Sequence, residues 1–356
     1  MPEGSLPLSE FRPVPKLAVR ASRIEQPRFP VVDAHNHVSW AGDWRVVDAG
    51  SLVETMDAAG VRVYVCLDFA GPDDPRDSLA AHLRRFKEPY PDRFAVFARP
   101  DWRVLEEPGF ETALAHRLRE CAALGAQGLK VWKDLGLRLR DSTGRLLRVN
   151  DRRLDPLFEQ AGALGLPVLI HVADPVAFFE PLDGRNERYE ELLEHPDWHF
   201  YGGDFPPFEQ IMDDLRDLIG RHRETVFIGA HVGCYAENLD YVGAMLREFP
   251  NYHVDISARI AELGRQPFTA RRFFLEFQDR ILFGLDSFPP ALAEYQTHYR
   301  FLETEDEYFD YTPDGEQPQG RWRIYGLNLP DEVLAKVYQL NACRLLPGLP
   351  KPGFSR

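Results

Sequence analysis

The sequence lacks the features that mark several large classes of protein. It has no long run of Lys and Arg, and its 56 acidic residues outnumber 42 basic ones, for a formal net charge of −14. Nucleic-acid binding needs a basic surface that displaces counterions, so we expect no nucleic-acid partner. No apolar run approaches the roughly 18 residues that span a bilayer, and residues 1–30 lack the apolar core of a signal peptide. We therefore expect a cytoplasmic protein with no membrane partner.

Cysteine is scarce, and several catalytic motifs are missing. The four cysteines (Cys66, Cys121, Cys234 and Cys343) are far apart and form no CxxC pair, which excludes a disulfide framework. We expect Cys66 and Cys121, which lie in apolar runs, to be buried and reduced. No GxGxxG follows the first predicted strand, and no P-loop, GxSxG or HExxH motif occurs. Dinucleotide-binding, serine-hydrolase and metalloprotease interpretations therefore have no motif to support them.

What the sequence does contain is a repeated alternation of short apolar runs and amphipathic segments. Residues 109–124 are an example of a predicted helix, with Phe110, Leu114, Leu118 and Cys121 at spacings of three and four. Strands that alternate with helices indicate βα units and a parallel sheet, and eight of them favour a closed (β/α)8 TIM barrel, an α/β fold. The eight predicted strands are 31–38, 61–69, 94–99, 125–132, 167–172, 225–231, 252–257 and 280–286.

We expect three parts along the chain: an N-terminal arm (1–30), a single barrel (31–349) and a short tail (350–356). The arm shows no periodicity, and we expect it to wrap the barrel or a neighbouring subunit. Two connections, 180–208 after the fifth strand and 287–328 after the eighth, are longer than usual. Loops that follow barrel strands emerge at the face where active sites form, so these two are expected to be lids or substrate walls.

Five residues with metal-ligating side chains lie at the carboxyl ends of predicted strands. His35 and His37 are two residues apart on the first strand, so their side chains point the same way. His171, His231 and Asp286 each follow an apolar run. A buried carboxylate is costly unless it is paired or binds a metal, and imidazoles are common ligands of divalent transition metals. The pattern therefore predicts a metal centre at one end of the barrel.

The order of these residues resembles the amidohydrolase superfamily, and in particular its amidohydrolase-related branch of TIM-barrel hydrolases and decarboxylases. The resemblance rests on Asp-Ala-His-Asn-His at 33–37, His171, His-Val-Gly at 231–233 and Phe-Gly-Leu-Asp-Ser at 283–287, and it spans about residues 31–345. It implies that His35, His37, His171 and Asp286 bind one divalent metal. It further implies that Asp286 moves protons during the reaction and that His231 polarises the substrate or orients water. His231 is a metal ligand instead in members with two metals.

Other residues near the predicted strand ends are candidates for substrate binding. The resemblance implies that Lys130 bridges two metals as a carbamate in binuclear members; we favour one metal, with Lys130 as an ammonium near the site. Alternation places Trp132 on the same face as Lys130 and Lys133 at the rim. Arg259 could bind a carboxylate, or it could be a surface residue paired with Glu262. Trp40 and Phe69 could add to a partly apolar pocket.

The predicted function is hydrolysis of a C–O or C–N bond in a small, anionic, carboxylate-bearing substrate by a metal-activated water. The main alternative is a non-oxidative decarboxylase that uses the same metal. A second alternative, a barrel that binds a ligand without catalysis, fits a complete ligand set less well. Zinc is the first expectation for the metal, with manganese, iron or cobalt also compatible with three histidines and an aspartate. A homo-oligomer is expected because this branch commonly forms one.

Overall fold

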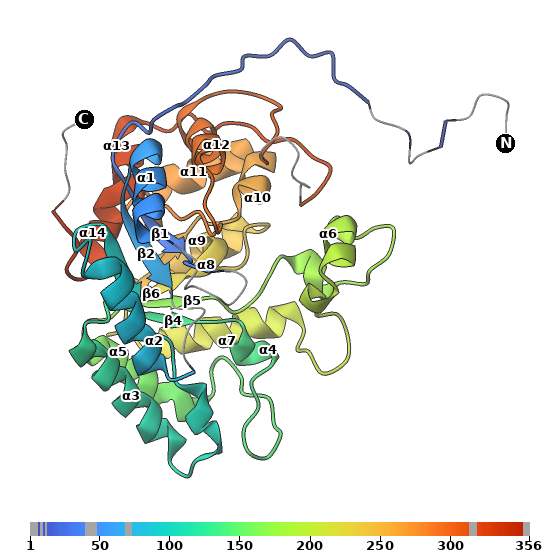
Figure 1. Cartoon of the computed structure of the whole chain (residues 1–356). Coiled ribbons are helices and arrows are strands. Elements are labelled where there is room, and N and C mark those ends of the chain that lie inside the picture. The colour runs from blue at the N-terminus through green and yellow to red at the C-terminus, as the bar shows by residue number, and fades with distance from the viewer. Residues whose placement is uncertain are drawn as a thin grey trace.

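Eight short parallel strands form the centre of the protein (Figure 1). The computed structural model describes residues 6–7, 10, 13–39, 48–67, 73–312 and 319–351. Each predicted strand contains an observed one, and the observed strands are shorter at their ends. They are β1 (Val31–Asn36), β2 (Val61–Leu67), β3 (Phe94–Phe97), β4 (Leu129–Val131), β5 (Val168–Ile170), β6 (Phe227–Gly229), β7 (Tyr252–Asp255) and β8 (Ile281–Leu282).

The strands lie in two sheets, in the orders β1-β2-β3 and β4-β5-β6-β7-β8, and backbone contacts join these sheets on both sides. Ala98 and Leu129 form a parallel bridge between the first sheet and the second. On the other side, Ala34 N donates to Phe283 O at 2.9 Å, and Asp286 N donates to His35 O at 2.8 Å. The strands therefore follow one another around a ring in chain order, as in a (β/α)8 barrel.

Helices connect the strands and cover them from outside. The predicted helix at 109–124 is observed as α3, its stripe of Phe110, Leu114, Leu118 and Cys121 is buried, and it ends at Gly125, whose φ is 115°. The helices are α1 (Ala49–Ala59), α2 (Pro75–His82), α3 (Phe110–Leu124), α4 (Asp134–Leu137), α5 (Asp155–Ala163), α6 (Tyr189–Glu194), α7 (Phe208–Arg221), α8 (Ala230–Gly233), α9 (Leu239–Glu248), α10 (Ile260–Arg265), α11 (Pro267–Glu276), α12 (Leu292–Glu303), α13 (Asp331–Ala335) and α14 (Asn341–Leu345). None of the described helices is both long and apolar enough to cross a membrane.

The core has an inner and an outer apolar layer because strand residues alternate in direction. Val63, Val65 and Leu67 of β2 belong to the inner cluster, together with Ala342 and Leu346 in and just after α14. Residues just beyond α14 bond near the starts of β2 and β4: Arg62 donates to Lys351 O at 2.8 Å, and Gln127 donates to Pro347 O at 2.6 Å. The α14 region thus closes the amino-terminal end of the barrel and leaves the carboxyl ends of the strands for a site.

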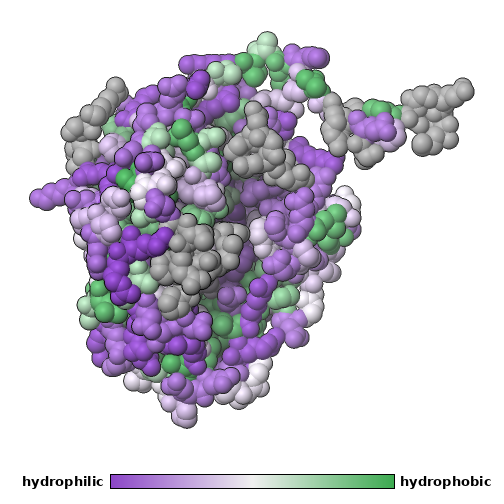
Figure 2. All heavy atoms as spheres, in the orientation of Figure 1, coloured by the Kyte–Doolittle hydropathy of each residue, from purple (hydrophilic) through white to green (hydrophobic). Residues whose placement is uncertain are grey.

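The described part of the N-terminal segment has no helix or strand between residues 13 and 30. Its later part is tied to the barrel: Ser22 Oγ donates to Asp306 Oδ1 at 2.8 Å, and Arg28 Nη1 donates to Asp331 Oδ1 at 2.6 Å. Its earlier part runs away from the barrel and exposes hydrophobic residues, whereas the rest of the face seen in Figure 2 is mostly hydrophilic.

Candidate metal centre

The five residues singled out in the sequence all lie at the carboxyl ends of the strands. His35 and His37 come from β1 and its end, His171 directly follows β5, His231 lies in the turn after β6, and Asp286 lies just beyond β8. All are buried except Asp286, whose side chain is 11% exposed. Asp286 Oδ1 lies 3.1 Å from His37 Nε2 and 3.8 Å from His35 Nε2, and Asp286 Oδ2 lies 3.6 Å from His231 Nε2. His35, His37 and Asp286 form one of the groups of ligand atoms that could hold a metal ion among the described residues.

One ring nitrogen of each of these four histidines faces an acceptor on the protein. His35 Nδ1 lies 2.9 Å from Asp255 Oδ2, and His37 Nδ1 lies 3.1 Å from Leu67 O. His231 Nδ1 lies 2.9 Å from Ser257 O, and His171 Nε2 lies 3.1 Å from Ala173 O. Carbonyls and carboxylates only accept, so we assign the proton to these nitrogens. The opposite nitrogens then keep their lone pairs, as metal-binding imidazoles do.

The lone-pair nitrogens of three of these histidines meet at the strand ends. Those of His35, His37 and His231 face the Asp286 carboxylate, which also only accepts, so lone pairs would repel one another there unless a cation lies between them. The buried Nδ1 of His171 has no hydrogen-bond partner among the described residues, although the ring packs 4.4 Å from that of His231, measured between centroids. A buried nitrogen left without a partner is costly, and a metal ligand is one way to satisfy it. The donor set therefore fits a divalent cation.

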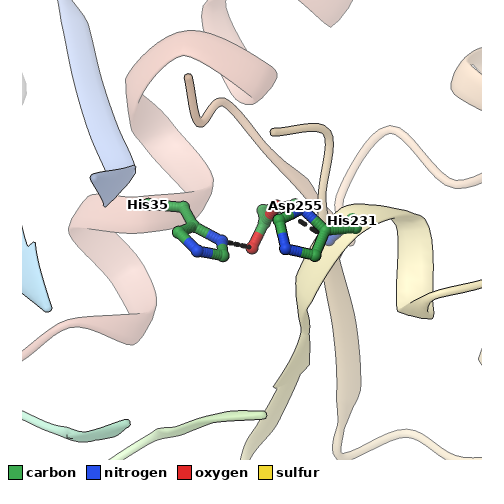
Figure 3. A group of neighbouring side chains, drawn as sticks. All are labelled: His35, His231 and Asp255. Carbon is green, nitrogen blue, oxygen red and sulfur yellow. Dashed lines mark hydrogen bonds and ion pairs between the residues drawn. The ribbon is translucent and has the colours of Figure 1, made fainter. Parts of the chain in front are cut away.

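Asp255 supports the site, and the sequence analysis did not single it out. Figure 3 shows His35 pointing from β1 to the Asp255 carboxylate at the end of β7, with His231 beside it. Asp255 Oδ1 accepts from His231 N at 3.1 Å, from Ser257 N at 3.0 Å and from Ser257 Oγ at 2.5 Å. His35, His231 and Asp255 lie close enough to hold a metal by distance alone. We regard Asp255 as the residue that orients His35, because both its oxygens already accept hydrogen bonds.

The buried environment sets the protonation states that a metal centre needs. Burial lowers the pKa of His37, of His231 and of His171, the last to about 4, so these imidazoles are neutral at pH 7. Burial alone would raise the pKa of Asp286, but the neighbouring His35 and His37 outweigh it and lower this pKa well below its usual range. Neutral imidazoles and an ionised carboxylate are the forms that bind metals.

Lys130, on β4, and Trp132, directly after it, have side chains on the same side of the chain, as alternation predicted. The Lys130 ammonium lies 3.1 Å from His35 Nε2 and 4.7 Å from the centroid of the Trp132 ring. Burial lowers the pKa of Lys130 to about 8. The Trp132 ring packs against His37, with 5.0 Å between centroids. Lys130 is fully buried and lies against the ligands, so any contact it makes with a substrate would be at the floor of the site.

A cavity of about 580 Å³ opens above Asp286, His171 and His231. Its apolar wall contains Trp132, Phe178 and Trp198. Its polar wall contains Lys133 and Arg259, among other residues. Lys133 is bound to Asp174, whose Oδ1 lies 3.4 Å from His171 Nε2. Trp40 and Phe69, which we also expected near the pocket, lie outside the described residues.

Arg259 is not the surface residue that one interpretation of the sequence allowed. It is only 5% exposed, and its Nη1 donates to Ala258 O at 2.8 Å. Glu262, its expected partner in that interpretation, is bound to the buried Arg188 instead. That interpretation is therefore wrong, and the Arg259 side chain is a buried part of the cavity wall.

Both long connections contribute to the cavity, as predicted. Residues 180–208 supply Glu191, Asp197 and Trp198, and residues 287–328 supply Gln319. Arg188 holds the first connection against α10, because it pairs with Glu191 at 2.9 Å and with Glu262. The Arg188 guanidinium also lies 5.3 Å from the ring centroid of Trp322, in the second connection. The loops after β5, β7 and β8 therefore meet in one fixed wall.

Three residues at the ends of successive strands have a left-handed backbone. The φ angles are 58° at His231 after β6, 54° at Ala258 after β7 and 57° at Asp286 after β8. This conformation is uncommon for residues other than glycine and tends to occur at functional sites. The turns direct His231 and Asp286 inward and place Arg259, the residue after Ala258, at the cavity.

Comparison with known proteins agrees with this geometry. A family model described as amidohydrolase matches residues 32–348. The chain belongs to this amidohydrolase family. It is therefore an enzyme, and the non-catalytic interpretation is not supported. No curated protein matches the chain significantly.

Several solved structures share the fold at low sequence identity. A 2,6-dihydroxybenzoate decarboxylase from Rhizobium is 18% identical, with 91% of this chain and 98% of that chain covered and a TM-score of 0.54. A dihydroxybenzoic acid decarboxylase from Polaromonas sp. JS666, with bound manganese and the inhibitor 2-nitroresorcinol, is 15% identical, with coverage of 86% and 90% and a TM-score of 0.55. An uncharacterized TIM-barrel protein from Bordetella bronchiseptica is 18% identical, with coverage of 85% and 83% and a TM-score of 0.51. These likenesses show a TIM-barrel fold.

Proposed function

We propose that this enzyme is a metal-dependent decarboxylase that removes CO2 from a small planar acid without a redox cofactor. The observation that carries the proposal is a cavity with aromatic walls whose floor joins Asp286 to His171 and His231. Such walls suit a flat, conjugated acid. Two fold neighbours are named as decarboxylases of dihydroxybenzoates, which favours decarboxylation over the hydrolysis that the sequence put first.

The proposed ligands of one divalent cation are His35, His37, His171 and Asp286. A cation bound there would supply positive charge that orients the acid and stabilises developing negative charge. Zinc and manganese both suit these ligands, and the Polaromonas neighbour contains manganese. Lys130, Trp132, Lys133 and Arg259 are the proposed substrate contacts, with Lys130 and Trp132 at the floor and the other two at the wall.

The reaction replaces the bond between a carbon atom and its carboxylate with a bond to hydrogen. We assign proton delivery to Asp286, whose low pKa means that it must first receive a proton. His231 is the proposed carrier, because its Nε2 lies 3.6 Å from Asp286 Oδ2. Neutral at rest, His231 would take a proton from water on Nε2 and pass it to Asp286, because burial lowers its pKa and it holds that proton weakly. The hydroxide left behind combines with the released CO2. As the carbon atom gains this proton, the electron pair of the breaking bond stays with the ring and CO2 leaves.

The test is to load the purified enzyme with manganese or zinc and offer hydroxybenzoates that carry ¹³C in the carboxylate. We expect ¹³CO2 and the decarboxylated ring from at least one of them, and loss of both products after chelation, with recovery when metal is returned. Hydrolysis is the second candidate, favoured by the description of the family model. Turnover of esters or amides with no CO2 from any acid would favour it and overturn the proposal.

A further inference from the structure

Arg259 differs from Lys133, another cation of the cavity, because its charge has no carboxylate beside it; Arg138 also has no ion pair in the described ranges, but its side chain is exposed. Among the described residues, no carboxylate oxygen lies within 4.0 Å of the Arg259 guanidinium, the limit for an ion pair. Lys133, by contrast, is bound to Asp174. Of the Arg259 donors, only Nη1 has a hydrogen bond within the described part of the chain, to the backbone at Ala258. Nε and Nη2 remain free to bind a ligand.

Burial makes these free donors unusual. Arg259 is only 5% exposed, and its Nε and Nη2 are among the atoms left open, at the cavity. A charge that is mostly withdrawn from bulk water gains more from a bound anion than an exposed one does. The more distant carboxylates of Glu191 and Glu237 lie close enough for the Arg259 charge to lower their pKa values, which burial raises. Their attraction offsets part of the cost of burying the guanidinium charge, but neither carboxylate accepts a hydrogen bond from it. These donors belong to a residue that lines the same cavity as Asp286.

The shape of a guanidinium selects its partner. Two parallel N–H groups match the two oxygens of a carboxylate, which gives a bidentate pair that is stronger than a single hydrogen bond. The acid group that leaves as CO2 in the proposed function lies at the metal ligands. Arg259 and Asp286 line the same cavity of about 580 Å³, which has room for one ring, so an anion on Arg259 can be a second group of the same substrate.

We propose that Arg259 forms a second anion subsite and that the substrate is a planar diacid, with one carboxylate at the metal centre and the other on Arg259. This inference rests on the proposed function only in placing the first carboxylate at the metal. The proposed subsite can be tested by binding alone, because diacids should bind more tightly than monoacids whether or not any of them reacts. Trp132, Phe178 and Trp198 would contact the ring between the two acid groups.

Binding of three probes to the manganese-loaded enzyme tests the subsite, by calorimetry or by quenching of tryptophan fluorescence. The probes are isophthalate, its neutral monoamide 3-carbamoylbenzoate, and benzoate. We expect isophthalate to bind about tenfold or more tightly than either of the others. Equal affinity for isophthalate and 3-carbamoylbenzoate would overturn the proposal with no mutation required.

Variants assign this preference to Arg259. Arg259→Met should abolish the preference, so that isophthalate and the other two probes bind about equally. Arg259→Lys should keep part of the preference, because lysine keeps the positive charge but lacks the paired N–H donors of a guanidinium. Arg140→Met is the matched control: Arg140 is 42% exposed and pairs with Asp204. It should keep the full preference. An Arg259→Met protein with wild-type melting temperature and unchanged preference would contradict the subsite.

The two proposals fail in different ways. If the preference for isophthalate depends on Arg259 but no acid releases CO2, the subsite is supported and decarboxylation is contradicted. If monoacids release CO2 at a rate that Arg259→Met does not change, decarboxylation is supported and the subsite is contradicted.

Discussion

Asp255 Oδ2 lies 2.9 Å from His35 Nδ1, so a carboxylate at the end of β7 orients a ring on β1, the strand on the other side of β8. This pair fixes which nitrogen of His35 carries the proton and which one faces Asp286. The metal centre thus depends on a residue that is not itself proposed to bind metal.

Asp255→Asn should weaken metal binding about 10–100-fold, the usual effect of removing the partner of a ligating histidine. The amide keeps the size of the carboxyl but loses the charge that holds the Nδ1 proton of His35. Metal titration followed by calorimetry measures the change. Asp204→Asn, a substitution of a carboxylate that is 88% exposed, is the control and should bind metal normally. An affinity within twofold of wild type for Asp255→Asn would contradict the assigned role.

His231→Asn should separate proton transfer from metal binding. We propose His231 as a proton carrier and not as a ligand, so the variant should keep its metal while kcat falls about 10²–10⁴-fold. His35→Ala, at a proposed ligand, should lose both. Elemental analysis of the purified variants, beside their rates, gives the comparison. If His231→Asn lost its metal as His35→Ala does, His231 would be a ligand and Lys130 should be examined as a carbamate bridge.

Acid should destabilise the fold partly through His298, on α12 away from the proposed ligands. Burial lowers the pKa of His298 from 6.5 to about 4, so between these values the unfolded chain binds a proton that the folded chain does not. The free energy of unfolding therefore falls as the pH falls through this window, by up to about 3 kcal/mol.

His298→Phe removes this titration and should flatten the pH dependence of stability between about pH 6.5 and 4, measured by urea unfolding. His298 packs near Phe283, with 5.9 Å between ring centroids, so a phenyl ring suits the site. His116→Gln replaces an imidazole that is 59% exposed and should leave the profile unchanged. An equally steep profile for both variants would mean that other groups cause the acid sensitivity.

Arg188→Met should destabilise the enzyme by about 3–5 kcal/mol, because it leaves the buried Glu262 and the partly buried Glu191 without their cation. It should also weaken substrate binding by loosening the wall between the loops, while metal affinity stays near that of wild type. Unfolding and metal titration measure the two effects. Arg185→Met, at a side chain that is 89% exposed, is the control for a nearby lost charge. Loss of metal together with stability would show that the wall also supports the metal centre.

The barrel, and which residues gather at the candidate site, could be predicted from the sequence because both follow from local pattern. Alternation placed His35 and His37 together, and the ends of apolar runs located His171, His231 and Asp286. These signals depend on residues close in the chain, so one sequence is enough to see them.

The remaining features depend on distances between residues far apart in the chain. Asp255 also ended an apolar run, and that position was the available signal, but its role depends on His35, 220 residues away. The left-handed residues His231, Ala258 and Asp286 are not themselves glycines, so their residue types do not mark this backbone conformation. The pairing of Glu262 with Arg188 rather than Arg259 is set by how the long connections pack, which no local pattern encodes.

The Arg188 pairs with Glu191 and Glu262 have a consequence for how this enzyme can evolve. The connection of residues 180–208 forms a wall that is anchored by its own arginine, apart from the strands that carry the proposed ligands. Substitutions in that connection can change which molecules are accepted while the reactive end stays as it is. New substrate preferences can therefore arise by small steps, each of which leaves a working catalyst.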